Sequence, residues 1–173
     1  MFGCASVAFA VTPAVLVERL GDGAIAYATL LAVVALVFGA AVQPLAPRIG
    51  AATGGRQLVV GLAVALVGLL GAALVAAVQQ PLLGVPVAAV LGAGYGVCLV
   101  SGLTEVQRIA PPDELAALTA VYYSATYLGF LLPVVLASLA AAAQEPLLLL
   151  LVAVLCAVSL AAVLRNTAGA SRN

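Results

Sequence analysis

Long stretches without a charged side chain constrain this chain more than any other feature of its sequence. The chain has 173 residues, and no charged residue lies between Arg56 and Glu105 or between Asp22 and Arg48. Charged residues make up 7% of the chain and hydrophobic residues 66%, against about 25% and about 45–50% in soluble domains. Because a soluble domain needs far more charge on its surface, the sequence predicts an integral membrane protein.

The lengths of these apolar stretches predict helices that cross the membrane. A membrane-spanning helix needs about 20 apolar residues, and a continuous apolar run favours helices over the alternating strands of a barrel. Gln79-Gln80-Pro81 and Gln144-Glu145-Pro146 mark turns between spans, since proline cannot continue a helical hydrogen-bond ladder. We expect an all-α integral membrane protein whose residues 1–173 form a single domain of six transmembrane helices, at about 1–17, 24–43, 58–78, 82–104, 115–142 and 147–164.

The first of these segments is short for a membrane helix. We interpret it as a shortened helix rather than a signal peptide, because no basic residue precedes its apolar run.

The arginines predict the orientation of the chain in the membrane. If the chain crosses the membrane at the predicted spans, five of them lie on one side of the membrane: Arg48, Arg56, Arg108, Arg165 and Arg172. Arg19 is the one arginine on the other side of the membrane. Positively charged loops stay on the cytoplasmic side, so we expect a multi-pass protein of the plasma (inner) membrane with both termini in the cytoplasm.

Several classes of function are excluded by residues that the chain lacks. It contains no histidine, which rules out histidine-based zinc sites and serine–histidine catalysis. Cys4, Cys98 and Cys156 lie too far apart in the sequence for a metal motif or a disulfide framework. The net charge is zero, whereas nucleic-acid binding requires basic patches. We therefore expect no enzyme, no catalytic residue, no metal, no cofactor and no nucleic-acid partner.

Polar side chains are distributed unevenly among the predicted spans. The span 58–78 has none, and the span 147–164 has only Ser159 besides Cys156, whereas the other four carry Ser, Thr or Tyr. We expect the third and sixth helices to face lipid and the other four to face a more polar environment. This pattern repeats every three helices, and repeats of three spans are a building unit of secondary transporters. Chance variation among six helices is the alternative.

Two stretches carry a resemblance to a known family. Residues 39–56, GAAVQPLAPRIGAATGGR, resemble the loop motif Gly-x-Leu-Ala-Asp-Arg-x-Gly-Arg-Arg of the major facilitator superfamily, with Leu45-Ala46, Arg48 and Gly50 at matching positions. Gln43 and Pro47 depart from it, replacing the first Gly and the Asp. Residues 104–133 look like the connection between the fourth and fifth helices of the C-terminal half of such a transporter.

The resemblance implies a function and a partner. Members of that family have twelve helices in two halves, and this chain is similar to helices seven to twelve. It would then transport a small solute as part of a secondary transporter, together with a missing N-terminal six-helix half or a second copy of itself. A self-associating half-transporter and a non-transporting membrane remnant or accessory subunit are the alternatives.

The resemblance also implies a cytoplasmic gate at the loop motif, formed by Arg48, Gly50, Arg56 and Glu105. In the family, a carboxylate at the position of Glu105 pairs with the loop arginine. The simpler interpretation is that the arginines only set orientation, while Glu105 pairs with Arg108 three residues further along the helix.

A second group of candidate residues lies within the spans. A partly polar stripe on the fifth span consists of Thr119, Tyr123, Thr126, Tyr127 and Phe130. Tyr95 and, from this stripe, Tyr123, Thr126 and Tyr127 are candidates for lining a substrate path, although tyrosines are also common at membrane interfaces. Gly92 and Gly96 form a GxxxG pattern, which predicts close helix packing.

Overall fold

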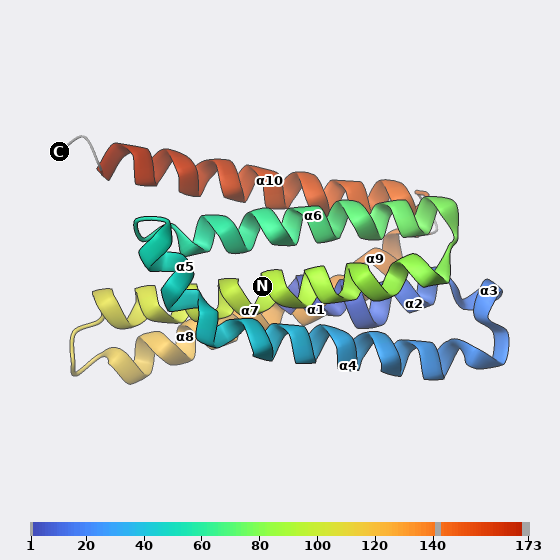
Figure 1. The fold of residues 1–173 in the computed structure, drawn as a ribbon, viewed down its shortest axis with the longest axis horizontal. Coiled ribbons are helices and arrows are strands. Elements are labelled where there is room, and N and C mark those ends of the chain that lie inside the picture. The colour runs from blue at the N-terminus through green and yellow to red at the C-terminus, as the bar shows by residue number, and fades with distance from the viewer. Residues whose placement is uncertain (1, 141–142, 171–173) are drawn as a thin grey trace.

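The computed structural model describes residues 2–140 and 143–170, and these residues form helices without any strand (Figure 1). Met1, residues 141–142 and Arg172, which belong to the predicted first span, fifth span and C-terminal tail, lie outside the described residues. In the described residues, five helices are long and apolar enough to cross a membrane. A further apolar helix at the N-terminal end, Gly3–Val15, is shorter than these five. The all-α membrane fold is thus confirmed, and a sixth full span stays a prediction.

Several of the membrane segments are divided into shorter helical elements. The first contains α1 (Phe2–Ser6), the π-helix η1 (Val7–Val11), α2 (Thr12–Val15) and α3 (Val17–Leu20). The second contains the 3-10 helix η2 (Gly21–Gly23), α4 (Ala24–Val42), the 3-10 helix η3 (Gln43–Leu45) and α5 (Ala46–Ala52). The third and fourth are α6 (Gln57–Val78) and α7 (Pro81–Ile109). The fifth contains α8 (Leu115–Tyr127), the 3-10 helix η4 (Leu128–Leu131) and α9 (Leu132–Leu139), and the sixth is α10 (Glu145–Ala170).

Helix α7 is packed between α4 and α6 at backbone distance. A Cβ atom added to Gly92 would lie 2.8 Å from the Cα of Ala35 on α4, closer than real Cβ atoms approach. A Cβ on Gly94 would lie 2.7 Å from the backbone nitrogen of Ala65 on α6, and Gly96 also faces the backbone of α4. Small residues allow this approach, so the glycines of α7 fix its position between its two neighbours.

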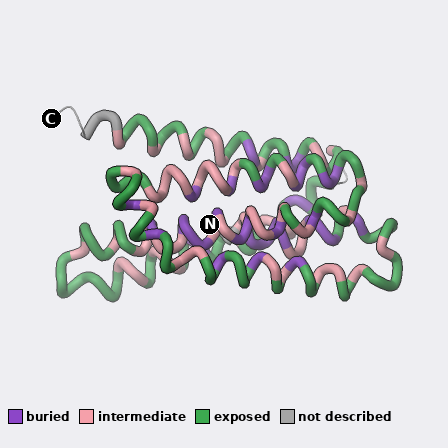
Figure 2. The backbone as a smooth tube through the Cα atoms, viewed as in Figure 1, coloured by how far each residue is buried: buried purple, intermediate pink, exposed green. Residues whose placement is uncertain are grey.

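The positions of α6 and α10 differ from each other, although the spans predicted within them, 58–78 and 147–164, have almost no polar side chains. Helix α10 lies at the edge of the bundle and exposes a row of leucines and valines (Figures 1 and 2). Helix α6 packs between α7 and α10, and only a narrow stripe that includes Val67, Leu70 and Leu74 is exposed. The expectation that the third helix faces lipid therefore holds only for this stripe, because two neighbouring helices cover the rest of its surface.

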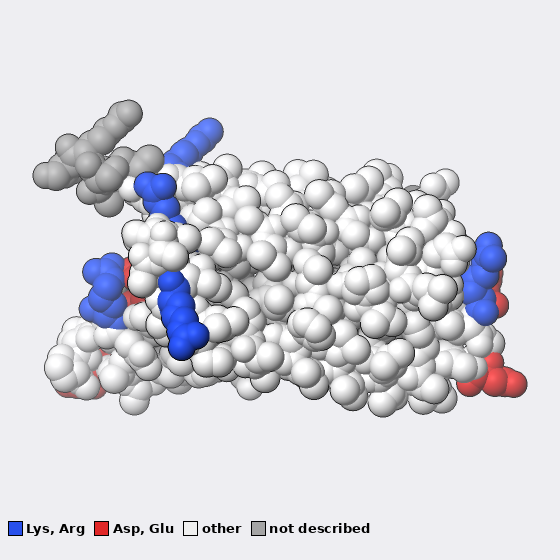
Figure 3. All heavy atoms as spheres, in the orientation of Figure 1, with Lys and Arg blue, Asp and Glu red and all other residues white. Residues whose placement is uncertain are grey.

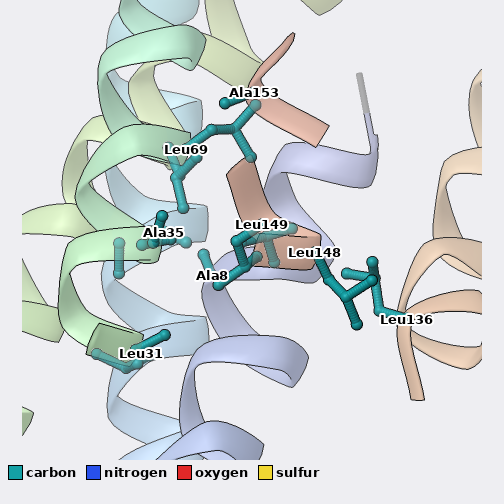
Figure 4. Packing of buried hydrophobic residues seen from close by; sticks show 14 residues of the cluster. Ala8, Leu31, Ala35, Leu69, Leu136, Leu148, Leu149 and Ala153 are labelled. Atoms are coloured by element: carbon teal, nitrogen blue, oxygen red, sulfur yellow. The ribbon is translucent and has the colours of Figure 1, made fainter. Parts of the chain in front are cut away.

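Buried aliphatic residues join most of the membrane segments into one core. The labelled members of this cluster pack together in Figure 4: Ala8, Leu31, Ala35, Leu69, Leu136, Leu148, Leu149 and Ala153. On the face of the molecule seen in Figure 3, charged side chains lie at the two ends and leave a wide uncharged band between them. A band of this kind fits the hydrocarbon layer of a bilayer.

Two prolines interrupt the first and fifth segments at places that come to lie close together. The π-helix Val7–Val11 directly precedes the turn that contains Pro13, and the 3-10 helix Leu128–Leu131 precedes Pro133. Proline lacks the N–H group that would bond the carbonyl four residues earlier. The carbonyl of Gly129 instead accepts hydrogen bonds from the backbone N–H of Leu132 and from the Ser6 hydroxyl at 3.3 Å. Local 3-10 or π geometry and serine donors are how membrane helices accommodate such breaks.

Candidate functional site

Four membrane segments meet at one groove, which we call the aromatic groove. Its volume is about 240 Å³. It is lined by Ala5 and Phe9 of the first segment, Ala32 and Leu36 of α4, Tyr95 of α7 and Phe130 of the fifth segment. These four segments are the ones that carry Ser, Thr or Tyr side chains in the sequence. In the structure, they surround one shared space.

The two proline-linked breaks position the phenylalanines of the groove. Phe9 lies in the π-helix before Pro13, and Phe130 lies in the 3-10 helix before Pro133. The centroids of their rings are 6.3 Å apart, which is within the range of favourable aromatic contacts. π-helical turns occur often at functional sites, and here the irregular backbone turns one ring from each segment toward the other.

Further aromatic rings continue from Phe130 along α8. Tyr127 stacks on Phe130 with centroids 6.0 Å apart, and Tyr123 follows with its centroid 6.5 Å from that of Tyr127. Two of the predicted path residues, Tyr123 and Tyr127, therefore form a row of rings that runs on from Phe130, although they do not line the groove itself. Thr126 has a different place, because its hydroxyl donates to the carbonyl of Tyr123 within the same helix at 2.8 Å.

Tyr95 connects the aromatic groove with a second cavity. Its ring lies against Gly39 of α4, where a Cβ atom would be 3.0 Å from the ring carbon Cδ1. It also lines a cavity of about 230 Å³ on the side of α6 and α10. Of all the residues predicted to line a path, Tyr95 alone forms part of the walls of both spaces.

The second cavity, which we call the thiol cavity, brings together three residues that are far apart in the sequence. Cys4, Cys98 and Cys156 all line it, and all three are free thiols. Among the described residues there is no group of three His, Cys, Asp or Glu placed to hold a metal ion. The thiols thus share one largely apolar space, which their spacing along the chain could not indicate.

At the arginine-rich end, the ion pair of Glu105 is with Arg108. The Nε atom of Arg108 donates to Oε2 of Glu105 at 2.9 Å, and both side chains are exposed. Glu105 makes no ion pair with Arg48 in the described part of the chain. In this conformation, Glu105 thus pairs with its neighbour on the same helix, as the simpler interpretation of the sequence expects. A gate between Arg48 and Glu105 stays a prediction for another conformation of a complete transporter.

The other two predicted gate residues lie on either side of the turn between α5 and α6, Gly50 within α5 and Arg56 at the N-cap of α6. Gly50 closes the end of α5, because its carbonyl accepts the N–H of Gly55 at 2.8 Å, and Gly54 and Gly55 both have positive φ angles. Glycine adopts such angles readily. Arg56 lines a groove at this end of the bundle together with Glu105 and Arg108.

Sequence reasoning did not single out Phe9. The signal was present in the spacing of the prolines, since Pro13 follows Phe9 by four residues and Pro133 follows Phe130 by three. A proline within a span marks the carbonyl that loses its helical partner, and both rings lie next to such a position.

Comparison with known families gives one match. A family model described as Major Facilitator Superfamily matches residues 1–134. No curated protein and no solved structure matches the chain. The matched residues include every residue that lines the aromatic groove.

Proposed function

The chain belongs to the major facilitator superfamily, and we propose that it transports a small solute as the C-terminal six-helix half of a secondary transporter. The family consists of transporters and not enzymes. This agrees with the expectation from the sequence, which has no histidine and no metal-binding motif. The aromatic groove is the observation that carries this proposal.

The segments that line the aromatic groove support its assignment to a transport path. Sites in such transporters lie near the middle of the membrane where two repeats meet, and the groove joins the first, second, fourth and fifth segments. In the isolated chain, Tyr127 is 55% exposed and Phe130 is 39% exposed. We infer that the second half of the transporter packs over these rings and closes the groove.

The chemistry of the groove narrows the class of solute. Its lining consists of alanine, leucine, phenylalanine and tyrosine side chains, so ring faces and a phenol hydroxyl are the groups that this half offers. Such walls bind apolar or aromatic parts of a solute, and ring faces also attract cations. Ion coupling needs an ionisable group, which we assign to the partner half or to Glu105 near the membrane surface.

The proposal is tested by comparing the chain alone with the chain beside a partner half. Liposomes with the purified chain should take up little tritiated glucose, alanine or tetraphenylphosphonium, because one wall of the path is absent. A six-helix N-terminal half encoded with it, or a tandem fusion of two copies, should restore uptake of at least one probe. Uptake by a chain shown to be monomeric in the same liposomes would contradict the half-transporter proposal, and no uptake with either partner would contradict transport of these solute classes.

The orientation of the chain gives a separate prediction. The arginine-rich end, which includes the loop after α5, should face the cytoplasm. We expect an Ala52→Cys variant at the end of α5, next to that loop, to react with an impermeant maleimide only after the membrane is opened. A Gln80→Cys variant between α6 and α7 should react in intact cells, with the three native cysteines replaced by alanine in both. The reverse pattern would invert the topology.

A further inference from the structure

A groove at the arginine-rich end of the bundle has a polar mouth formed by three elements. Its volume is about 390 Å³. The beginning of α6, the end of α7 and the end of α10 supply its walls, which are lined by Gly55, Arg56, Gln57, Leu58, Val59, Ser101, Glu105, Arg108, Val163, Asn166 and Thr167. Arg56 and Glu105 belong to the predicted gate, but that prediction does not account for an arrangement in which two arginines, one glutamate and several uncharged polar side chains line one space.

The mouth of this groove is suited to an anion. Arg56 and Arg108 both line it, while Glu105 pairs with Arg108 alone. The first turn of α6 also borders the groove, and Arg56 at its N-cap position gives it no side-chain hydrogen bond. The first N–H groups of a helix lack partners within the helix and favour negative charge. Guanidinium groups and helix N–H groups together form a site for a phosphate group.

This polar mouth and the thiol cavity lie next to each other along the same three helices. Leu58 at the mouth is one turn from Leu62 in the thiol cavity on α6, and Val163 is one turn from Ser159 on α10. On α7, Ser101 at the mouth is three residues from Cys98 in the cavity. Helix α6 packs against both α7 and α10 and forms the floor. At 1.5 Å per residue, the path from Arg108 to Tyr95 is about 20 Å long.

The polarity of this path changes in the way that an amphipathic ligand requires. The mouth holds arginine, asparagine, threonine and glutamine side chains and the carboxylate of Glu105, which is paired with Arg108, whereas the thiol cavity is lined mainly by leucine, valine, alanine, glycine and cysteine. Leu155 and Ser159 of the thiol cavity are exposed on α10, so the path opens sideways toward the bilayer. A free phosphate ion would fill only the mouth and leave the apolar part without an occupant.

We propose that this path binds an anionic phospholipid, with the phosphate between Arg56 and Arg108 and one acyl chain lying on α6 between α7 and α10. Basic pockets between membrane helices bind lipid headgroups of this kind. The site requires only that the chain lies in a bilayer, which its family membership shows. It therefore does not depend on whether the aromatic groove transports a solute.

The headgroup part of the site is tested by native mass spectrometry of the full chain with phosphatidylglycerol and phosphatidylcholine of identical acyl chains. We expect phosphatidylglycerol to remain bound at detergent levels that remove phosphatidylcholine. Each of Arg56→Gln and Arg108→Gln should weaken phosphatidylglycerol binding about fivefold. Arg48→Gln is the matched control, because Arg48 lies at the same end of the bundle but does not line the groove. Equal losses in all three variants, or equal retention of both lipids, would overturn the proposal.

The acyl-chain part is tested by filling the thiol cavity. Ser159→Phe places a ring in the path, and its matched control is Ser138→Phe on α9, since both serines are exposed and donate to the carbonyl four residues earlier. Only Ser159→Phe should weaken phosphatidylglycerol binding. Displacement of the lipid by inorganic phosphate, with no effect of Ser159→Phe, would identify a site for free phosphate instead and would overturn the lipid proposal.

Discussion

Gly92→Ala should lower the unfolding temperature of the chain, although alanine is the better helix former by about 1 kcal/mol. An added Cβ at this position would meet the carbonyl carbon and the Cα of Ala35, each at 2.8 Å. These are backbone atoms, so no side-chain rotation can make room for it, and α4 and α7 must move apart. Overpacking of this kind costs about 1–3 kcal/mol or more, which outweighs the gain in helix propensity.

The measurement is thermal unfolding of the purified chain in detergent, followed by size-exclusion chromatography. The scaling for chains of this length predicts a fall of about 2–4 °C per kcal/mol of net destabilisation. Gly23→Ala serves as the matched control, because an added Cβ there meets nothing within 4 Å and its φ angle is −79°. A Gly92→Ala variant that unfolds at the same or a higher temperature than the natural chain would show that α4 and α7 do not approach this closely.

The sequence predicts the order and approximate limits of the membrane segments because charges and prolines act locally. Gln79 adopts a left-handed conformation directly before the turn into Pro81, where the sequence places the boundary between the third and fourth spans. The neighbours of a helix depend instead on the whole bundle. Residues 58–78 of α6 have no polar side chain. This fits contact with lipid and burial among apolar helices equally well, and only the packing of α7 and α10 on its two sides decides between them.

The same distinction applies to the candidate site. Tyr95 stands out in the sequence as a polar side chain within a span, and it lines the aromatic groove. Phe9 has no such signal of its own, since a phenylalanine in an apolar run has many equivalent neighbours. Its role depends on the π-helix that Pro13 induces and on the matching break at Pro133. The convergence of the three cysteines on one cavity likewise depends on contacts between distant segments.

The gate residues illustrate competition between local and distant partners. Glu105 and Arg108 are three residues apart on one helix, so their pairing needs no particular tertiary arrangement. A pair between Glu105 and Arg48 needs the ends of two segments to approach. Such a pair would distinguish two states of a transporter. Glu105 would pair with Arg108 in the present state and with Arg48 in the other.

Tyr95→Ala should reduce solute uptake about tenfold or more in the transporter assembled from both halves. The ring of Tyr95 lies against Gly39 and forms part of the wall of the aromatic groove, which Phe9 and Phe130 also line. Removing it would open the aromatic groove toward the thiol cavity, since the same ring borders both spaces. The solute would lose one aromatic face, and a loss of about 1.4 kcal/mol in its binding already corresponds to a tenfold effect.

Two companion variants separate the role of the ring from that of the hydroxyl and from a general loss of stability. Tyr95→Phe keeps the wall intact, so it should retain most of the uptake if the ring face is what contacts the solute. Tyr122→Phe removes a hydroxyl that donates to the carbonyl of Leu99 at 2.8 Å, outside the lining of the aromatic groove, and should leave uptake unchanged. A Tyr95→Ala variant that folds normally and transports at the natural rate would place the solute path elsewhere. A loss in Tyr95→Phe as large as in Tyr95→Ala would show that uptake depends on the hydroxyl and not on the ring face.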